Sequence, residues 1–334
     1  MSLKRKKGES KQESKSDAEL VHDLLGKDKK RTYQSQVLFD PNQPIVSATD
    51  WIQMPHPWNK LTGTKGIPFG HVTTIQGKPD SGKTTLAMHG MVEAQEQGFN
   101  VVLIDTEFKF NFDRLEKMGG VVKKMNVLKA DSIEDGFVAM SDIIDAYIKI
   151  NGRPTLVVWD SLGLTPTDDE LKAGLKKASV ALAARIIKRS LRILRAKFHK
   201  TNTGVVFINH LYDNINALFG NSTKGYGGNG AYFASSLVLE VQRIQNKYKQ
   251  VKGERVVSGV VSGIKCTKNH LSNVQGAKCQ VLIGETGIDQ GSIEELKAKG
   301  TANEDDIDVD IDDIDVDIPD GPKIKMKNGR EVTL

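Results

Sequence analysis

Short apolar runs alternate with longer amphipathic stretches between residues 71 and 209. The runs hold almost no polar position, as in strands buried on both faces, and the stretches repeat apolar residues at helical spacing. Strands are predicted over 71–77, 100–105, 125–130, 155–160 and 204–209, and helices over 83–97, 111–118, 133–150 and 179–199. This alternation predicts an α/β fold with a mostly parallel central sheet flanked by helices.

The pattern changes after residue 235, where apolar runs follow one another without long helices. These runs cover 235–244, 255–268 and 277–284. They predict C-terminal β-hairpins that extend the central sheet. Before the core pattern, residues 36–40 form an isolated apolar island that is consistent with a lone strand docking elsewhere.

Composition divides the 334-residue chain into four parts. Residues 1–35 are predicted to be a disordered basic segment, and 36–60 a linker or protomer-docking segment. Residues 61–290 form the predicted core, and 291–334 a low-complexity acidic tail. No apolar run approaches the roughly 18 residues of a membrane span, and no secretory signal is present, so a cytoplasmic location without a membrane partner is predicted.

Two cysteines, Cys266 and Cys279, lie in apolar stretches and are predicted to be reduced core thiols. Their spacing with His270 matches no common zinc pattern.

The net charge of +5 hides a strong asymmetry. Residues 304–320 carry ten acidic side chains and no basic one, so the rest of the chain is near +15 (5 plus 10). A basic body favours a polyanionic partner such as nucleic acid, although basic surfaces also serve solubility. The acidic tail is predicted to compete with DNA for the basic body; a solubility or partner-docking tail is the alternative.

"GKPDSGKTT" fits the pattern G-x-x-x-x-G-K-[ST] between a predicted strand and a predicted helix. Gly77 and Gly82 allow backbone amides to surround a phosphate, Lys83 reaches the β- and γ-phosphates, and the Thr84 hydroxyl suits Mg²⁺. The predicted ATP-binding residues are Gly77, Lys78, Pro79, Asp80, Ser81, Gly82, Lys83, Thr84 and Thr85.

Polar residues end three neighbouring strands, at the edge where ligands of parallel sheets bind. Asp160 is predicted to complete the Mg²⁺ shell through water; capping of the next turn is the alternative. Glu107, with Asp105 as the weaker candidate, is predicted to orient the attacking water rather than form a structural salt bridge. His210 is predicted to sense the γ-phosphate and to transmit its loss to the following loop, unless it only anchors that loop.

A long Gly- and Asn-rich segment, residues 211–230, follows the last of these strands. Its glycines allow close approach to a strand of nucleic acid, and its aromatic rings can stack on bases. A plain surface loop is the alternative. The predicted DNA-binding residues here are Tyr212, Phe219, Asn221, Lys224, Tyr226, Gly227, Gly228 and Asn229.

Together these features resemble the RecA family of strand-exchange recombinases, including its phage UvsX-type members, over most of residues 61–289. The marks are "GKPDSGKTT", "LIDTE", "LVVWDS", "ALAARI", "FGN…GGN" and "KCTKNH". The resemblance implies a RecA-type P-loop ATPase core that assembles as a filament on single-stranded DNA, with ATP and Mg²⁺ bound between protomers.

The resemblance also implies roles for individual residues. Glu107 would be the catalytic carboxylate, His210 stands where bacterial RecA has glutamine, and Lys268 would reach the neighbouring protomer's ATP. Arg114 falls near the adenine-stacking tyrosine, and its guanidinium can stack on the base instead. The segment 165–179 would be the first DNA loop, with phosphate contacts from Lys172, Lys176 and Lys177.

Two departures stand out. About 45 residues follow the core, and their composition could not build the C-terminal domain of bacterial RecA; the N-terminal segment also lacks an obvious family polymerisation helix. In addition, His270 stands where bacterial RecA has a second lysine. The basic helix face of Arg185, Arg189 and Arg192 is expected to be ordinary surface or a protomer contact.

The predicted function is a DNA-dependent ATPase, converting ATP to ADP and phosphate, that promotes homologous pairing and strand exchange. Its predicted partners are single-stranded DNA, double-stranded DNA during exchange, further copies of itself in a filament, and a single-strand-binding or mediator protein. A RecA-type ring motor or helicase, and an ATP-binding mediator without strand exchange, are the alternatives.

Overall fold

The computed structural model describes residues 51–55, 58–174, 180–213, 223–225, 230–252, 254–289, 323–325 and 331–333. The chain divides into two units, Met1–Ile293 and Glu294–Leu334. In the second unit, β13 (Lys323–Lys325) pairs antiparallel with β14 (Glu331–Thr333), a pairing that the sequence did not predict. The acidic run 304–320 and the island 36–40 lie outside the described residues.

A ten-stranded sheet forms the centre of the first unit, in the order β12-β11-β10-β9-β3-β7-β6-β4-β5, with β8 beside β7. The strands are β3 (Val72–Gly77), β4 (Asn100–Asp105), β5 (Met125–Leu128), β6 (Thr155–Asp160), β7 (Thr203–Asp213), β8 (Thr223–Gly225), β9 (Leu237–Val251), β10 (Glu254–Asn269), β11 (Lys278–Gly284) and β12 (Gly287–Asp289). Six neighbouring strands of this order, β9, β3, β7, β6, β4 and β5, run parallel to one another. Strands β10, β11 and β12 extend the sheet beyond β9 with antiparallel pairs. The predicted fold class is confirmed. A separate pair joins β1 (Trp51–Gln53) to β2 (Gly66–Pro68).

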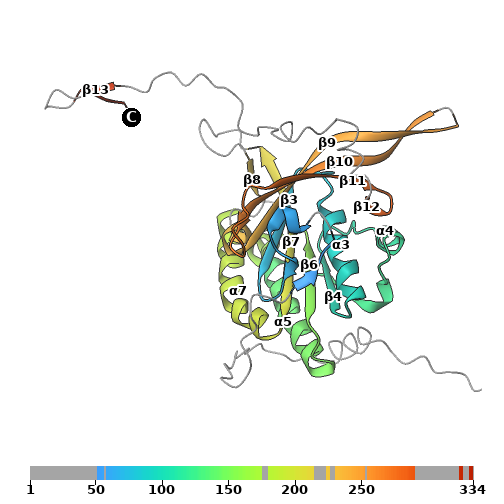
Figure 1. Cartoon of the computed structure of the whole chain (residues 1–334). Helices are drawn as coiled ribbons and strands as arrows, with labels where there is room; N and C mark the ends of the chain where they lie inside the picture. The colour runs from blue at the N-terminus through green and yellow to red at the C-terminus, as the bar shows by residue number, and fades with distance from the viewer. Residues whose placement is uncertain are drawn as a thin grey trace, which may run out of the picture. The chain divides into compact units, whose positions relative to one another are not determined.

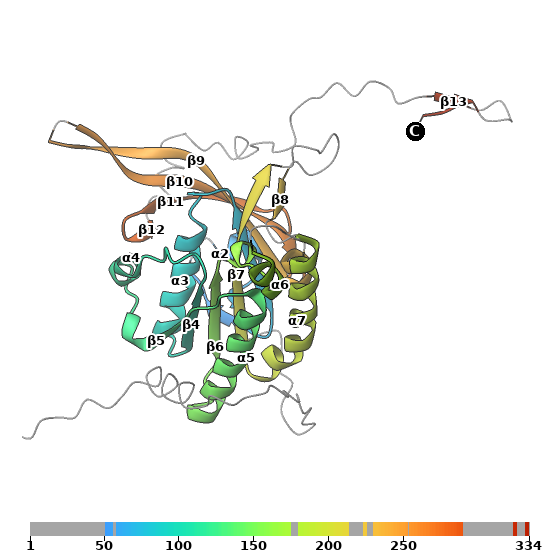
Figure 2. The same ribbon diagram turned by 180° about the vertical axis from the view of Figure 1, so that it is seen from behind.

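Helices cover both faces of this sheet (Figures 1 and 2). They are α2 (Trp58–Thr62), α3 (Lys83–Glu96), α4 (Phe112–Lys117), α5 (Ile133–Ile150), α6 (Asp168–Ala173), α7 (Val180–Lys200) and α8 (Gly230–Ala234). Helix α3 packs on one face, whereas α5 and α7 pack on the other.

Strand β6 shows why this arrangement is stable. Leu156 and Val158 join the core under α3, and Val157 and Trp159 join the core under α5 and α7. All four side chains are fully buried. Because successive strand residues point to opposite faces, a strand covered on both sides must be apolar throughout, and this is the pattern from which the sheet was predicted.

Side-chain caps begin several of the helices, among them α5 and α6. The Ser132 hydroxyl accepts a hydrogen bond from the Asp135 amide and so caps the start of α5. Strand β7 continues to Asp213, beyond its predicted end at residue 209, because Leu211–Asp213 pair with β8. The segment 165–179 is not all loop: α6 forms there, and a capping box between Thr167 and Glu170 begins it.

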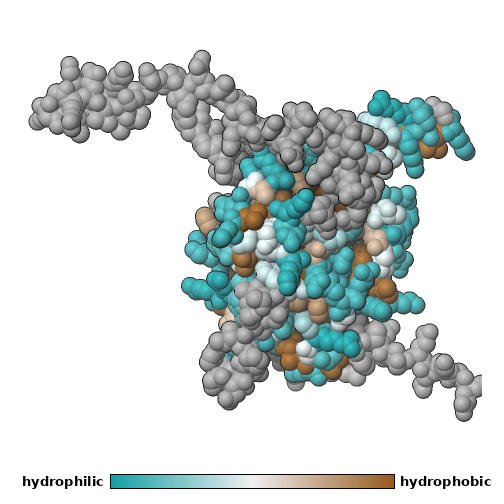
Figure 3. Space-filling model, in the orientation of Figure 1, coloured by the Kyte–Doolittle hydropathy of each residue, from teal (hydrophilic) through white to brown (hydrophobic). Residues whose placement is uncertain are grey.

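Strands β9 and β10 continue past the sheet as a two-stranded ribbon (Figures 1 and 2). Within β9, only Leu237–Glu240 pair with β3. Within β10, only Val260–Lys265 pair with β11. The projecting end carries both hydrophilic and hydrophobic residues on its surface (Figure 3). No helix among the described residues is long and apolar enough to cross a membrane.

Both cysteines are free. Burial raises the pKa of Cys266 to about 11 and that of Cys279 to about 12, so both thiols stay protonated at neutral pH.

Candidate nucleotide-binding site

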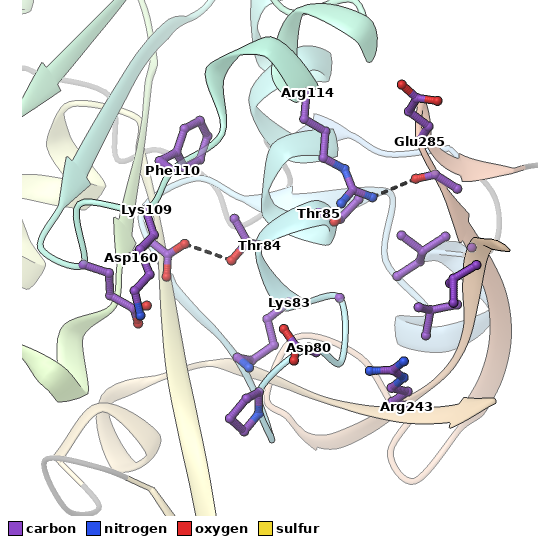
Figure 4. Close-up of a pocket in the computed structure, with 18 of the residues that line it drawn as sticks. Asp80, Lys83, Thr84, Thr85, Lys109, Phe110, Arg114, Asp160, Arg243 and Glu285 are labelled. Carbon is purple, nitrogen blue, oxygen red and sulfur yellow. Dashed lines mark hydrogen bonds between the residues drawn. The ribbon is translucent and has the colours of Figure 1, made fainter. Parts of the chain in front are cut away.

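A pocket of about 690 Å³ opens at the carboxyl ends of the parallel strands. The predicted phosphate loop, Asp105, Glu107, Asp160 and His210 line one part of it, and residues of β9, β10 and β11 line the rest. Figure 4 shows the labelled side chains that surround this space. Elements far apart in sequence therefore bring the predicted nucleotide residues together.

The phosphate loop joins β3 to α3 and is packed against the antiparallel strands. A Cβ atom added to Gly77 would lie 2.1 Å from the Val241 carbonyl oxygen, and one added to Gly82 would lie 2.2 Å from Ile283 Cδ1. Gly82 also has φ of 98°, a left-handed conformation that favours glycine. The Ser262 hydroxyl donates to the Ser81 carbonyl at 2.9 Å, which fixes the loop from β10.

Lys83 is 4% exposed, and its ammonium group donates to the Lys78 carbonyl at 2.7 Å. Burial lowers the pKa of Lys83, although Asp160, Glu107 and Asp80 act in the opposite direction. A buried cation at a helix N-terminus, facing an open pocket, is suited to an anionic ligand.

Thr84 and Asp160 lie side by side, because the Thr84 hydroxyl donates to Asp160 Oδ2 at 2.9 Å (Figure 4). Burial raises the pKa of Asp160 to about 6, with smaller contributions from Glu107 and Asp105. Hard oxygen donors of this kind fit Mg²⁺, and a cation would stabilise the costly buried carboxylate. These two residues therefore fit the predicted Mg²⁺ site.

Glu107 and His210 form a close pair, with His210 Nε2 2.7 Å from Glu107 Oε1. Their side chains are 14% and 17% exposed, so both are largely shielded from solvent but still line the pocket. The pair links the end of β4 to β7 and thus to the residues that follow β7.

Asp105, the weaker candidate for orienting water, holds a turn instead. Its Oδ1 atom accepts hydrogen bonds from the amides of Glu107 and Phe108, at 3.2 and 2.9 Å. Phe108 has φ of 55°, a conformation that a bulky residue rarely adopts, and its side chain is 63% exposed. The turn places Glu107 on the pocket side, and Asp105 stabilises it.

Arg114, at the opposite end of the pocket from Asp160, comes from α4 (Figure 4). Its Nη2 atom donates to the Gly284 carbonyl at 2.7 Å, and its buried Nε atom has no hydrogen-bond partner among the described residues. Burial lowers its pKa, while Glu285 raises it. The guanidinium is therefore fixed at the pocket wall.

Lys268 does not join the pocket. It pairs with Val238 of β9, near the start of β3, whereas the phosphate loop follows the end of β3. Its ammonium group donates to the carbonyls of Tyr232 and Phe233, at 2.9 and 3.2 Å. Lys268 thus lies at the opposite edge of the sheet from its own phosphate loop.

Few predicted DNA-binding residues have described side chains. Lys172 is exposed on α6, and Tyr212 is partly exposed on β7. Lys224 lies in β8, of which only the backbone is described. Outside the described residues lie Lys176, Lys177, Phe219, Asn221, Tyr226, Gly227, Gly228 and Asn229.

Helix α7 carries the basic face that was expected to be ordinary surface or a protomer contact. Arg185, Arg189 and Arg192 recur at helical spacing and are exposed, and α7 carries no acidic side chain. Helix α7 follows the first predicted DNA loop in the chain, and α8 follows the second. Helix α8 packs against α7, because a Cβ added to Gly230 of α8 would lie 2.7 Å from the Ala184 carbonyl oxygen of α7. The sequence also missed pocket residues of the ribbon strands, including Arg243 and Lys249.

Comparison with known proteins gives a consistent result. The family model of the RecA N-terminal domain matches residues 56–289. The chain is 34% identical over 227 residues to "Protein RecA" of Aquifex aeolicus (strain VF5), which covers 67% of this chain and 63% of that protein. It is 34% identical to "Protein RecA" of Phytoplasma mali (strain AT) over 70% of this chain and 67% of that one, and 30% identical to "Protein RecA" of Gluconobacter oxydans (strain 621H) over 71% and 67%.

Proposed function

This chain belongs to the RecA family, and from that premise we propose that it is an ATP-dependent recombinase that forms filaments on single-stranded DNA and promotes homologous pairing and strand exchange. The chain spans about 63% of the length of the first curated relative. The proposal is therefore argued from the residues of this chain. The observation that carries the proposal is the Glu107–His210 pair, which joins a nucleotide pocket to the strand that leads into residues 211–230.

The proposed roles follow from the geometry of the pocket. Lys83 and the amides of the phosphate loop bind the triphosphate. Thr84 and Asp160 would hold Mg²⁺, which would supply charge neutralisation for the phosphates. Glu107 orients the attacking water, and Arg114 supports the base.

Coupling to DNA runs through His210. The Nε2 atom of His210 lies 2.7 Å from Glu107 Oε1. A γ-phosphate competes with Glu107 for the same N–H group, because both are anions. Exchange of this contact releases Glu107 toward water and shifts β7, whose continuation carries the predicted DNA-stacking aromatics.

The DNA surface combines the two predicted loops with α7. Tyr212, Phe219 and Tyr226 stack on bases, while Lys172 and Lys224 contact phosphates. Arg185, Arg189 and Arg192 extend this cationic surface along α7, because they begin beside both loops and face solvent.

Lys268 acts on the ATP of a neighbouring protomer. Its place at the edge opposite the phosphate loop supports this role, because a head-to-tail assembly brings opposite edges of successive copies together. Such contacts can repeat from copy to copy, and they give an open filament when the rotation between copies does not close.

The direct test measures ATP hydrolysis with and without single-stranded DNA, and joint-molecule formation between a single strand and a homologous duplex. We expect DNA to stimulate hydrolysis, and ATP to be required for joint molecules. Lys83→Ala should abolish both. ATP and DNA binding without joint molecules would favour a mediator, and closed rings in electron micrographs would favour a motor.

A further inference from the structure

The turn between β11 and β12 is tied to helices α3 and α4 by three side chains, of which His89 and Lys117 have no role in the proposed reaction. His89 Nε2, from α3, accepts a hydrogen bond from the Ile288 amide at 2.6 Å. Arg114, from α4, donates to the Gly284 carbonyl at 2.7 Å. Lys117 forms an exposed ion pair with Glu285 at the tip of the turn.

His89 is the most enclosed of these contacts. Burial and the nearby Arg114 lower its pKa to about 4, so the imidazole is neutral at physiological pH and its Nε2 lone pair is available to Ile288. Gly287 packs directly on it: an added Cβ would lie 2.5 Å from His89 Nε2 and 2.9 Å from Met118 Cε. Gly287 has φ of 99°, so two independent constraints require glycine here.

This turn forms one wall of the nucleotide pocket. Ile283, Gly284 and Glu285 line the pocket together with Arg114. In Figure 4, Arg114 and Glu285 lie on the side opposite Asp160, with Lys83 and Thr84 between. A triphosphate held by Lys83 and the phosphate loop would therefore place its nucleoside toward Arg114 and the turn.

We propose that His89 is a positioning residue for the nucleoside half of the substrate, because it holds the β11–β12 turn where Arg114 and Gly284 together form a fixed platform for a purine ring. This inference rests on the proposed function and deepens it. The Gly284 carbonyl holds the guanidinium in place, and a planar cation held in this way presents its flat face to an aromatic base.

The experiment compares two ligands on the full chain. Calorimetry with Mg²⁺ gives dissociation constants for ATP and for inorganic triphosphate, which has the phosphates without the nucleoside. His89→Leu keeps the bulk of the side chain and removes the acceptor for the Ile288 amide. We expect ATP to bind about tenfold more weakly, as when a buried donor loses its acceptor, and triphosphate to bind as before.

His89→Gln is the matched control, because a glutamine side chain offers a carbonyl acceptor to the same amide; it should recover most of the ATP affinity. Should His89→Leu fail to fold, Gly287→Ala displaces the turn from the other side and should give the same selective loss. An equal loss for both ligands, or none for either, would overturn the inference.

The wild-type protein separates this inference from the proposed function. ATP that binds no more tightly than triphosphate would refute a nucleoside platform and leave DNA-stimulated hydrolysis untouched. Failure to bind either ligand would contradict the proposed function itself.

Discussion

His210 Nε2 lies 2.7 Å from Glu107 Oε1, in a pair that joins the end of β4 to β7. This contact is consistent with the alternative role of Glu107, a structural salt bridge. The position of His210 suggests a further role for the contact, because His210 belongs to β7, the strand that leads to the second predicted DNA loop. Under the proposed function a γ-phosphate replaces this contact, and the pair then acts as a switch between two states of β7.

The first prediction concerns Glu107 as the residue that orients water. Glu107→Gln keeps the shape and a hydrogen bond to His210 but removes the carboxylate. We expect hydrolysis to slow by about 10² or more, with ATP affinity unchanged within a few-fold and DNA held more persistently. Steady-state ATPase rates, nucleotide affinity and DNA release rates measure this. Hydrolysis at the wild-type rate would reassign the group that activates water.

The second prediction concerns the buried carboxylate of Asp160. Its pKa is raised from 3.8 to about 6, so the folded chain holds the proton more tightly than the unfolded chain. Stability is then greatest below the unfolded pKa and falls as pH rises toward about 6; above that, ionisation costs about 3 kcal/mol.

Asp160→Asn removes this cost and can still accept from Thr84. Without nucleotide and Mg²⁺, we expect a higher melting temperature than wild type at about pH 8 and little difference at about pH 4. The same variant should lose Mg²⁺-dependent ATP binding. A difference in melting temperature that is constant across pH would contradict the raised pKa.

The sequence was sufficient for those parts of the site that depend on local pattern. Lys83 and Thr84 follow from a loop between a strand and a helix, and Glu107, Asp160 and His210 follow from the rule that parallel strands end at one edge. The alternation of apolar runs likewise predicted the order of strands and helices, because strands buried on both faces leave few polar positions.

Long-range pairing was beyond such reasoning. The position of β9 beside β3 places Val241, Ser262 and Ile283 against the phosphate loop, yet nothing local to these residues indicates it. The role of Asp105 depends on a backbone turn with an unusual φ at Phe108, and the position of Lys268 depends on the register of β10 with β9.

The third prediction concerns Lys268 in a site shared between protomers. Lys268→Ala and Lys83→Ala proteins should each be nearly inactive, because each lacks one half of the site. Mixed together they should recover part of the ATPase rate, since some interfaces pair an intact Lys83 with an intact Lys268. A cation that stabilises transition-state charge from a neighbour contributes about 10³ or more in rate. No recovery at any mixing ratio would favour a site within one chain.

The fourth prediction concerns the aromatic residues of the second predicted DNA loop. Phe219→Ala and Tyr226→Ala should each weaken single-strand binding by about 1–3 kcal/mol if the ring stacks on a base, and nucleotide affinity should stay unchanged. Fluorescence anisotropy with a labelled oligonucleotide measures the loss. Phe233→Ala is a matched control, because that ring is 66% exposed on α8, outside the loop. Unchanged DNA affinity in both loop variants would support a plain surface loop.

The last prediction concerns the cations on α7. Each arginine that contacts a DNA phosphate releases counterions, so its removal lowers the slope of log affinity against log salt by about 1. Arg189→Ala and Arg192→Ala should therefore weaken binding similarly on all sequences and flatten this slope, with the largest effect at low salt. Lys149→Ala removes the same charge from another helix, α5, and should leave the slope unchanged. Equal slopes for wild type and both arginine variants would mean that the face of α7 is ordinary solvated surface, because the slope counts the phosphates that the protein contacts and not its net charge.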